Sequence, residues 1–230
     1  MCRRIRSFGN LLVEDASICK IEGKKISKDA EEDMDRSRLE KQFEFIREID
    51  KEKFIGRQTY LSDGERKEND AEHAWHMSIM TILLGEYASK EIDVLKTVTM
   101  LLIHDLVEID AGDTYAYDEE GKKTKEEREK KAAERIYGLL PKDQGEKLLR
   151  IWEEFEEWQT SEACFAHAMD NLQPLMLNAA TDGKSWVEHG IHVDQVLKRN
   201  EHTALGSEEL WKYAYENFIC PNVEKGRLKK

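Results

Sequence analysis

The chain has 230 residues and a formal net charge of −12, with 36 basic and 48 acidic side chains. This length suits one domain around a single core, and so acidic a surface repels a nucleic-acid polymer. The four cysteines stand far apart without a CxxC pair, which excludes a zinc ribbon or a dense disulfide framework. No run of about eighteen apolar residues occurs, so we expect a cytoplasmic protein that does not enter a membrane.

The first 35 residues show no clear period and end in the polar tract KKISKDAEEDMD. We therefore predict a loosely ordered extension over residues 1–35, followed by one domain over residues 36–230. A second interpretation is that the native protein starts at Met34, which mass spectrometry of the natively expressed chain would decide.

From residue 36 onward the spacing of apolar residues is helical. Steps of three and four predict one buried stripe on the first helix, formed by Leu39, Phe43, Ile46 and Ile49. Asp70 can cap a helix over about residues 71–89, whose stripe is His73, Met77, Met80, Leu84 and Tyr87. The next helix, about 91–109, is apolar throughout, as expected for a central helix, and should stop near Gly112.

The rest of the chain continues in the same way. An irregular loop, TYAYDEEGKKT, precedes a charged surface helix, KEEREKKAAERIYGLL, which Pro141 should end. Two further helices follow, over residues 142–158 and 161–180, and Pro174 should kink the second. A last pair is expected over about 189–199 and 207–219. With only three prolines and almost no alternating β pattern, the chain is predicted to be all-α.

The stretch LLIHDLVEIDAGDT places His104 beside Asp105 inside an apolar run. Neighbouring residues on a helix point about 100° apart, so both side chains can touch a ligand above the seam between them. His73 and Asp170 lie in apolar stretches of other helices and could supply further donors. Four buried ionisable groups are costly without compensation, and one divalent cation would satisfy them all.

A plainer interpretation applies to each residue singly. A lone histidine on an apolar face is more commonly a hydrogen-bonded core residue than a metal ligand, and we assign His76 and His167 in that way. The case for a metal site depends on the combination of four ligand-type residues, two of them adjacent, in apolar helical stretches.

This order of residues resembles the HD-domain metal-dependent phosphohydrolases. NDAEHAWH is similar to the first-histidine helix of the 5′-deoxynucleotidase branch, and IHDLVEIDAGD resembles its doublet followed by a glutamate and a Gly-Asp pair. FAHAMDNLQ is similar to the helix that bears the last aspartate, and Arg57 falls where the branch keeps a phosphate-contacting arginine. The resemblance covers roughly residues 38–220.

The resemblance implies an HD-domain helical bundle that holds one divalent cation through His73, His104, Asp105 and Asp170. Two imidazoles and two carboxylates suit a borderline ion such as Co²⁺, Mn²⁺, Fe²⁺, Ni²⁺ or Zn²⁺ better than calcium, whose sites are built from oxygens alone. Mg²⁺ is kept as a further candidate for the ion. No histidine stands between Asp105 and His167, which favours a single ion over a dinuclear centre. Gln58 stands where the branch typically has a tryptophan near the sugar, which leaves the choice between ribose and deoxyribose open.

The implied activity is metal-assisted attack of water on the phosphate monoester of a small substrate, such as a (deoxy)nucleoside 5′-monophosphate. Arg57 would hold the phosphate as a planar fork. Glu108 lies one helical turn beyond Asp105 and can position the water or act as general base. Asp113, just after Gly112, would contact the sugar or protonate the leaving oxygen.

Three alternatives remain open from the sequence. The domain could bind a nucleotide or metal as a sensor without turnover, it could be an iron oxygenase, or it could be a helical scaffold. The glutamate after the doublet argues against the sensor, and the missing histidines argue against the oxygenase. A homodimer is also expected, with an interface at Trp152, Phe155 and Trp158, although their spacing suits core positions equally well.

Overall fold

The computed structural model describes residues 22–117 and 120–230, and it divides the chain into two units, Met1–Ser37 and Arg38–Lys230. The first described element is helix α1 (Glu22–Ile49), so residues 22–35, expected to be loosely ordered, are helical. The rest of the predicted extension, residues 1–21, lies outside the described residues. No helix in the described ranges is long and apolar enough to cross a membrane.

The buried stripe predicted for α1 is wrong for three of its four residues, and only Ile49 packs against a hydrophobic cluster. Leu39, Phe43 and Ile46 are each about half exposed, whereas Phe45 is the residue of this stretch that enters the core. Phe45 packs with Leu106 and other residues in the smaller of two hydrophobic clusters. The apolar residues do lie along one side of α1, but no other element packs over Leu39, Phe43 and Ile46 among the described residues.

A short connection leads from α1 to the helices that carry the histidines. It consists of a 3-10 helix η1 (Asp50–Phe54) and an antiparallel pair of strands, β1 (Gly56–Tyr60) and β2 (Lys67–Asn69). Helix α2 (Asp70–Leu84) follows directly. Its N-cap is Asn69 and not the predicted Asp70, because Asn69 and Glu72 exchange side-chain and backbone hydrogen bonds in a capping box.

The predicted helix over 91–109 is divided into three pieces. After a 3-10 turn, η2 (Gly85–Tyr87), α3 (Val94–Ile103) passes into a second 3-10 helix, η3 (His104–Val107), and then α4 (Glu108–Ala111). The chain ends this helical run at Gly112, as predicted, with a φ of +74°. Residues three apart eclipse each other in a 3-10 helix, so the break places Asp105 and Glu108 on one side.

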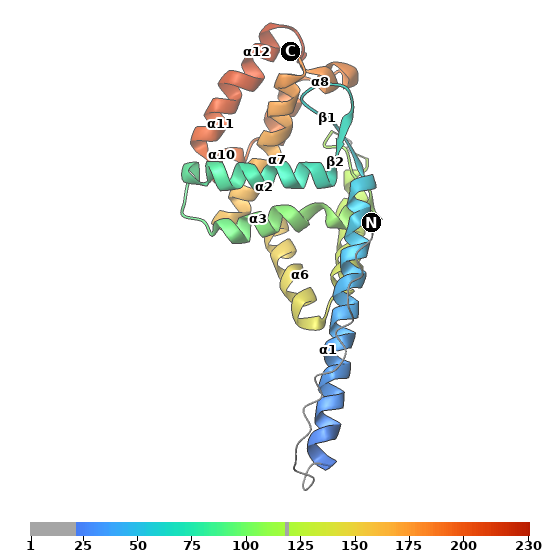
Figure 1. Cartoon of the computed structure of the whole chain (residues 1–230). Coiled ribbons are helices and arrows are strands. Elements are labelled where there is room, and N and C mark those ends of the chain that lie inside the picture. Colours follow the sequence, from blue (N-terminus) through green and yellow to red (C-terminus); the bar gives the residue numbers. More distant parts are fainter. Residues whose placement is uncertain (1–21, 118–119) are drawn as a thin grey trace, which may run out of the picture. The chain divides into compact units, whose positions relative to one another are not determined.

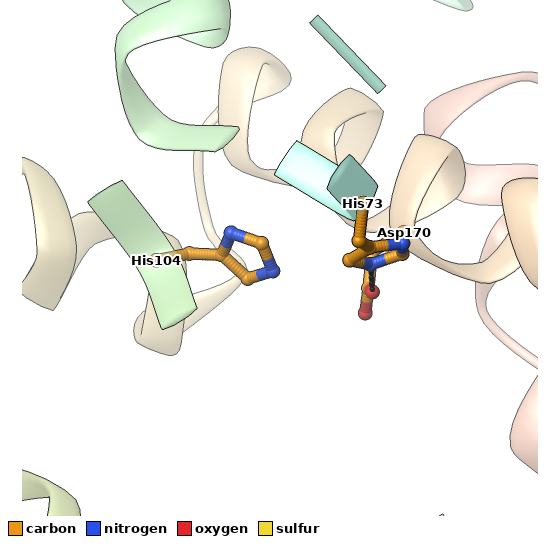
Figure 2. Close-up of side chains that lie close together, drawn as sticks. All are labelled: His73, His104 and Asp170. Atoms are coloured by element: carbon orange, nitrogen blue, oxygen red, sulfur yellow. Dashed lines mark hydrogen bonds and ion pairs between the residues drawn. The ribbon is translucent and has the colours of Figure 1, made fainter. Parts of the chain in front are cut away.

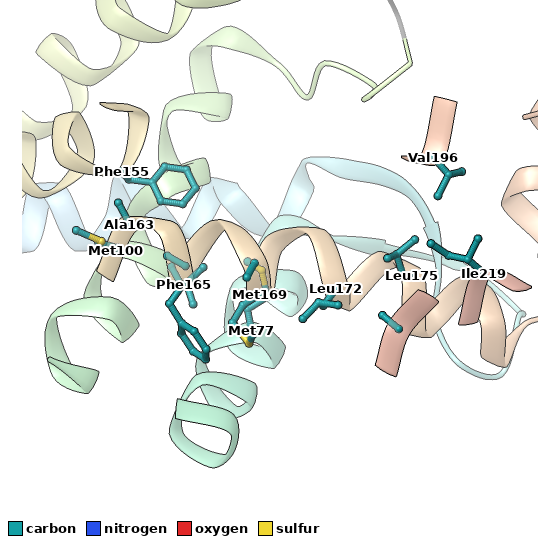
Figure 3. Close-up of a cluster of buried hydrophobic side chains, with 14 of the residues drawn as sticks. Met77, Met100, Phe155, Ala163, Phe165, Met169, Leu172, Leu175, Val196 and Ile219 are labelled. Atoms are coloured by element: carbon teal, nitrogen blue, oxygen red, sulfur yellow. The ribbon is translucent and has the colours of Figure 1, made fainter. Parts of the chain in front are cut away.

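The central helix of the domain is α7 (Ser161–Ala180), which runs through Pro174. Its neighbours α2, α3 and α6 (Lys142–Glu157) pack against it, and α5 (Lys122–Tyr137) packs beside α4 and η3. Figure 3 shows residues of α7 such as Phe165, Met169 and Leu172 in the larger hydrophobic cluster, beside Met77 of α2. This packing explains why α7 is mostly buried, although the kink at Pro174 stays a prediction.

The C-terminal part of the chain forms short helices. They are α8 (Lys184–His189), α9 (Val193–Arg199), α10 (Thr203–Gly206), α11 (Glu208–Ala214), a π-helical turn η4 (Tyr215–Ile219) and α12 (Cys220–Glu224). Helix α10 packs so closely on α7 that a Cβ at Gly206 would collide with the Cys164 carbonyl oxygen. Apart from the two short strands, the described residues are helical or irregular, so the all-α prediction is confirmed.

Candidate metal centre

Two histidine–carboxylate pairs from three separate regions of the chain meet inside the domain. His73 Nε2 of α2 lies 3.0 Å from Asp170 Oδ1 of α7, and His104 Nε2 lies 3.0 Å from Asp105 Oδ2 within η3. Figure 2 shows the His104 ring pointing toward the His73–Asp170 pair, and the two imidazole centroids are 6.0 Å apart. All four side chains are nearly or fully buried.

The second nitrogen of each imidazole is already engaged. Gln173 Oε1 lies 3.0 Å from His73 Nδ1, and the Leu101 carbonyl oxygen lies 2.9 Å from His104 Nδ1. Both partners are hydrogen-bond acceptors, so each Nδ1 carries the proton and donates. In the neutral rings, the lone pair of each Nε2 therefore faces a carboxylate oxygen.

Two facing acceptors repel unless a proton or a cation lies between them. His104 Nε2 makes no hydrogen bond of good geometry despite its approach to Asp105, although it is buried. Oxygen and Nε2 atoms of His73, His104 and Asp170 lie within 4.8 Å of one another, so one ion can touch all three. The donor set thus fits a divalent transition-metal ion, with Asp105 as the neighbouring fourth ligand.

The pKa values of His73 and His104 are shifted in opposite directions. Burial and the positive charge of Arg57 lower the pKa of His73 to about 4, although Asp170 opposes the shift. Burial also opposes a charge on His104, but the negative charge of Asp105, 3.0 Å from Nε2, outweighs it and raises the pKa of His104 to about 9. The His104–Asp105 pair therefore holds a proton more readily than the His73–Asp170 pair.

A second acidic cluster adjoins the first. Carboxylate oxygens of Asp70, Asp105 and Glu108 lie within 4.8 Å of one another. Arg57 of β1 joins them, because its Nη1 donates to Asp105 Oδ2 at 2.8 Å and to Asp70 Oδ1 at 3.1 Å. Burial and the charge of Asp105 raise the pKa of Asp70 to about 8, so one guanidinium does not neutralise the whole group.

Glu108 has the most strongly raised pKa of the carboxyl groups in this cluster. It is 4% exposed, and its Oε2 has no hydrogen-bond partner among the described residues. Burial, followed by the charges of Asp105 and Asp70, raises the pKa of Glu108 to about 11. A carboxyl group with one oxygen unsatisfied is poised to accept a hydrogen bond from a ligand in the pocket.

Beside these clusters is a cavity of about 250 Å³ that is open to solvent, and its lining includes His104, Asp105 and Asp170. Arg57, Glu108 and Asp113 all line its wall, and Gln58 lies beside them. Burial raises the pKa of Asp113. Gln58 is held by the Lys67 ammonium, which donates to its Oε1 at 2.5 Å. Both basic and acidic side chains therefore line the cavity.

Four site residues were missed by reasoning from the sequence or given another role: Asp70, Glu68, Gln173 and Arg199. Glu68 Oε2 accepts a hydrogen bond of 2.8 Å from Gln173 Nε2, and Arg199 Nη2 lies 3.1 Å from Asp170 Oδ2. Gln173 did leave a signal, because it is a polar residue in an apolar stretch three positions after Asp170. Nothing in the sequence around Arg199 marked it.

Of the remaining predictions for this region, the one for His167 is confirmed and the one for a dimer interface is wrong. His167 is a buried core residue, as expected, with Nε2 donating to the Phe155 carbonyl oxygen at 2.8 Å. Of the two placements considered for Trp152, Phe155 and Trp158, the core is correct for Trp152 and Phe155, which are buried within the domain, and the interface is wrong. Trp158 lines the cavity and stacks on His167, with ring centroids 3.7 Å apart.

The chain is similar in sequence to a known domain family and to characterised relatives. A sequence profile described as HD domain matches residues 49–211. The 5′-deoxynucleotidase HDDC2 of Dictyostelium discoideum is 31% identical over 140 residues, which are 58% of this chain and 73% of that protein. The human 5′-deoxynucleotidase HDDC2 is 29% identical over 113 residues, 49% of this chain and 53% of the human protein. This chain thus matches about half to three quarters of these relatives' length.

A solved structure agrees with the sequence relatives. The crystal structure of a predicted metal-dependent phosphohydrolase from Magnetospirillum magnetotacticum superimposes with a TM-score of 0.80 at 47% identity, covering 84% of this chain and 97% of that one. The histidines and carboxylates that the helical bundle gathers at one cavity, together with these relatives, indicate the class of metal-dependent hydrolases. Within that class, the chain belongs to the HD domain family.

Proposed function

We propose that this protein hydrolyses the phosphate monoester of a small substrate, a nucleoside 5′-monophosphate or its deoxy counterpart. The observation that carries the proposal is the pair of Nε2 lone pairs, on His73 and His104, that face carboxylate oxygens at 3.0 Å beside an open cavity. The names of the curated relatives, 5′-deoxynucleotidases, support the same substrate class.

His73, His104, Asp105 and Asp170 would hold one divalent cation, of Co, Mn, Fe, Ni, Zn or Mg. Bound there, the ion supplies Lewis-acid polarisation of a phosphoryl oxygen. The chain itself prepares the site for the ion, because Gln173 and the Leu101 carbonyl fix the ring orientations and set the tautomer of each neutral imidazole so that Nε2 can bind the ion.

The other residues then have distinct tasks. Arg57 presents its guanidinium to the cavity and binds the phosphate oxygens. The phosphate would replace Asp70 and Asp105, the carboxylates that accept hydrogen bonds from Arg57 in this structure. Glu108 would accept a hydrogen bond from the attacking water through its unsatisfied oxygen. It would take the proton as general base once a bound cation offsets the charges of Asp105 and Asp70 that raise its pKa. Asp113, on the cavity wall, contacts the sugar or protonates the leaving alkoxide.

The sugar preference follows from the cavity wall near β1. Gln58 is tied to Lys67 and lines the cavity, so a polar amide stands at a wall that the sugar can reach. A polar wall tolerates a 2′-hydroxyl that an apolar ring would reject. We therefore propose that ribonucleoside and deoxyribonucleoside monophosphates are both cleaved.

The test is phosphate release from a panel of ribo- and deoxyribonucleoside 5′-monophosphates. Metal-stripped protein is supplied with Co²⁺, Mn²⁺, Mg²⁺ or Zn²⁺ in turn, with Asp105→Ala as the inactive control. Metal-dependent release that Asp105→Ala loses supports the proposal. Silence across the panel, with metal bound stoichiometrically, contradicts it and favours a sensor.

A further inference from the structure

The connection between α4 and α5 forms part of the cavity wall. Its first part, residues 112–117, contributes every residue from Asp113 to Tyr117 to the lining. These residues are neither helical nor in a strand, and within the described chain no backbone–backbone hydrogen bond involves any of them. Side chains must therefore fix the path of this segment, because holding a backbone in one conformation costs entropy that no ladder of hydrogen bonds offsets here.

The chain changes direction at Gly112, immediately before Asp113. The φ of Gly112 is +74°, and a Cβ at this position would meet nothing within 4 Å, so the backbone angle and not a lack of space favours glycine. Asp113 forms no hydrogen bond or ion pair with a described residue, although its side chain lines the cavity. The direction of its carboxylate thus depends on the main chain on either side.

Arg128 of α5 holds that main chain, although it does not itself line the cavity. Its Nη1 donates to the Ala111 carbonyl oxygen, and its Nη2 donates to Thr114 Oγ1 at 2.9 Å. Nη2 also donates to the Gly121 carbonyl oxygen at 3.3 Å. Ala111 precedes Asp113 in the chain and Thr114 follows it, so one planar guanidinium braces the turn from both sides.

All the hydrogen-bond partners of Arg128 among the described residues are uncharged, and the last of them is Thr124 Oγ1, 3.2 Å from Nε. The other arginine of α5, Arg135, differs in this respect, because its Nη2 donates to the carboxylates of Glu48 and Asp110, each at 2.8 Å. An ion pair joins two side chains. Hydrogen bonds to carbonyl oxygens fix the main chain directly, which is what the turn before Asp113 requires.

The far end of the segment has a separate anchor. The ring of Tyr115 packs against His189 of α8, with centroids 4.8 Å apart, and against Tyr117, with centroids 5.3 Å apart. Figure 1 shows α8 beside β1, the strand that carries Arg57. Loss of the Arg128 guanidinium would therefore release the main chain around Asp113, while the aromatic contacts keep the rest of the segment in place.

We propose that Arg128 is a positioning residue for Asp113: by fixing the main chain on both sides, it aims the Asp113 carboxylate at the sugar or the leaving oxygen of the substrate. This inference rests on the proposed function, because only there does Asp113 act on a nucleotide. A displacement of about 1 Å at a group that must meet the substrate can lower the rate about 100-fold. The contribution of Arg128 is thus confined to substrates that need Asp113.

The test compares two substrates in the metal-loaded enzyme. Deoxyadenosine 5′-monophosphate has the sugar and the alkoxide leaving group that Asp113 would serve, whereas p-nitrophenyl phosphate has no sugar and its p-nitrophenolate leaves without a proton. Arg128→Ala should lower kcat/KM for the nucleotide by about 10–100-fold and leave the value for p-nitrophenyl phosphate close to wild type. The matched control, Arg135→Ala on the same helix, should leave both values close to wild type.

Two further variants separate positioning from general damage. Arg128→Ala should add nothing to the loss already caused by Asp113→Ala, because both changes remove the same contribution. Arg128→Lys keeps the positive charge, but one ammonium group cannot span the acceptors that the guanidinium joins, so the same selective loss is expected. This variant also gives an answer if Arg128→Ala does not fold, which circular dichroism melting shows.

Hydrogen exchange of the substrate-free enzyme measures the bracing directly. Amides of residues 113–117 should exchange faster in Arg128→Ala than in the wild type, and Arg135→Ala should not change them. Equal losses for both substrates, additive losses in the double variant or wild-type activity in Arg128→Lys would each overturn the inference. A wild type that cleaves no nucleotide overturns the proposed function instead. Unchanged exchange in Arg128→Ala overturns the positioning role whatever the substrate.

Discussion

Gln173 Oε1 lies 3.0 Å from His73 Nδ1, and Gln173 Nε2 in turn donates to Glu68 at 2.8 Å. The amide thus has a fixed orientation, because its nitrogen is bound to the carboxylate and only its oxygen remains for the imidazole. All three side chains are at most 2% exposed. His73 is thereby held in the tautomer that leaves Nε2 free for a metal ion.

We expect Gln173→Leu to weaken metal binding by about 10–100-fold, since the leucine cannot hold the His73 tautomer or ring orientation. Competition with a chromophoric chelator measures the affinity, and nitrogen NMR of the imidazole reports the tautomer. Gln144→Leu is the control, because Gln144 is also a hydrogen-bonded glutamine but pairs with Gln42 away from the site. Equal metal affinity in Gln173→Leu and the wild type would contradict the assignment.

Arg199 is expected to assist the phosphate site from α9. Its Nη2 lies 3.1 Å from Asp170 Oδ2, and the side chain lines the cavity. Arg199→Ala should weaken inhibition by inorganic phosphate about tenfold through the loss of a charge-assisted contact. The same change should tighten metal binding several-fold, because a cation beside Asp170 is removed. Arg150→Ala, an exposed arginine of α6, should change neither quantity; weaker metal binding in Arg199→Ala would refute this role.

Glu108→Gln should lower kcat by about 10²–10⁴-fold, because the amide keeps the shape but cannot accept the proton of the attacking water. Metal content and KM should stay close to wild type. Steady-state kinetics with metal analysis of the same sample provides the measurement. Glu126→Gln, on the exposed side of α5, serves as the matched control. Activity retained in Glu108→Gln would show that another group takes the proton.

His167 should make the stability of the protein depend on pH. Burial lowers the pKa of His167 to about 3, well below the ordinary value of 6.5. The unfolded chain therefore binds the proton more readily than the folded chain between these two values. The stabilisation is complete above pH 6.5 and is lost as the pH falls toward 3. From pH 7 to pH 5 the loss amounts to about 2 kcal/mol.

His167→Phe keeps the ring between Phe155 and Trp158, with centroid distances of 3.8 and 3.7 Å in the wild type, but removes the titrating group. Urea unfolding of metal-free protein at pH 7 and pH 5 should show a drop in unfolding free energy that is about 2 kcal/mol smaller in the variant. At pH 7 the variant should itself be about 1 kcal/mol less stable, because the hydrogen bond to the Phe155 carbonyl is lost. Identical pH dependence of the two proteins would contradict the burial argument.

Helical periodicity was sufficient to predict where most helices lie and where the run after His104 ends. It failed where tertiary contacts override local preference. No proline or glycine interrupts the stretch from Val94 to Ile109, yet the structure changes from an α-helix to a 3-10 helix at His104. The stripe on α1 failed for another reason, because Leu39, Phe43 and Ile46 have the same spacing whether or not another element covers them.

The candidate metal residues were predicted because ionisable side chains in apolar helical stretches are costly without a partner. That argument selected His73, His104, Asp105 and Asp170 one element at a time. It did not find Gln173, whose partner His73 lies 100 residues away in the chain, or Arg199, which lies in an ordinary amphipathic helix. The amide of Gln173 gains its role only from the side chain it meets.

The sequence by itself determined the helical class and the set of residues that can bind a metal, because both depend on local spacing and on the cost of burying charge. Tertiary structure alone decided the pairing of His73 with Asp170 and the enclosure of Arg57 by carboxylates. Each of these depends on which helices pack together, and the free energy of packing is summed over contacts between residues far apart in the chain.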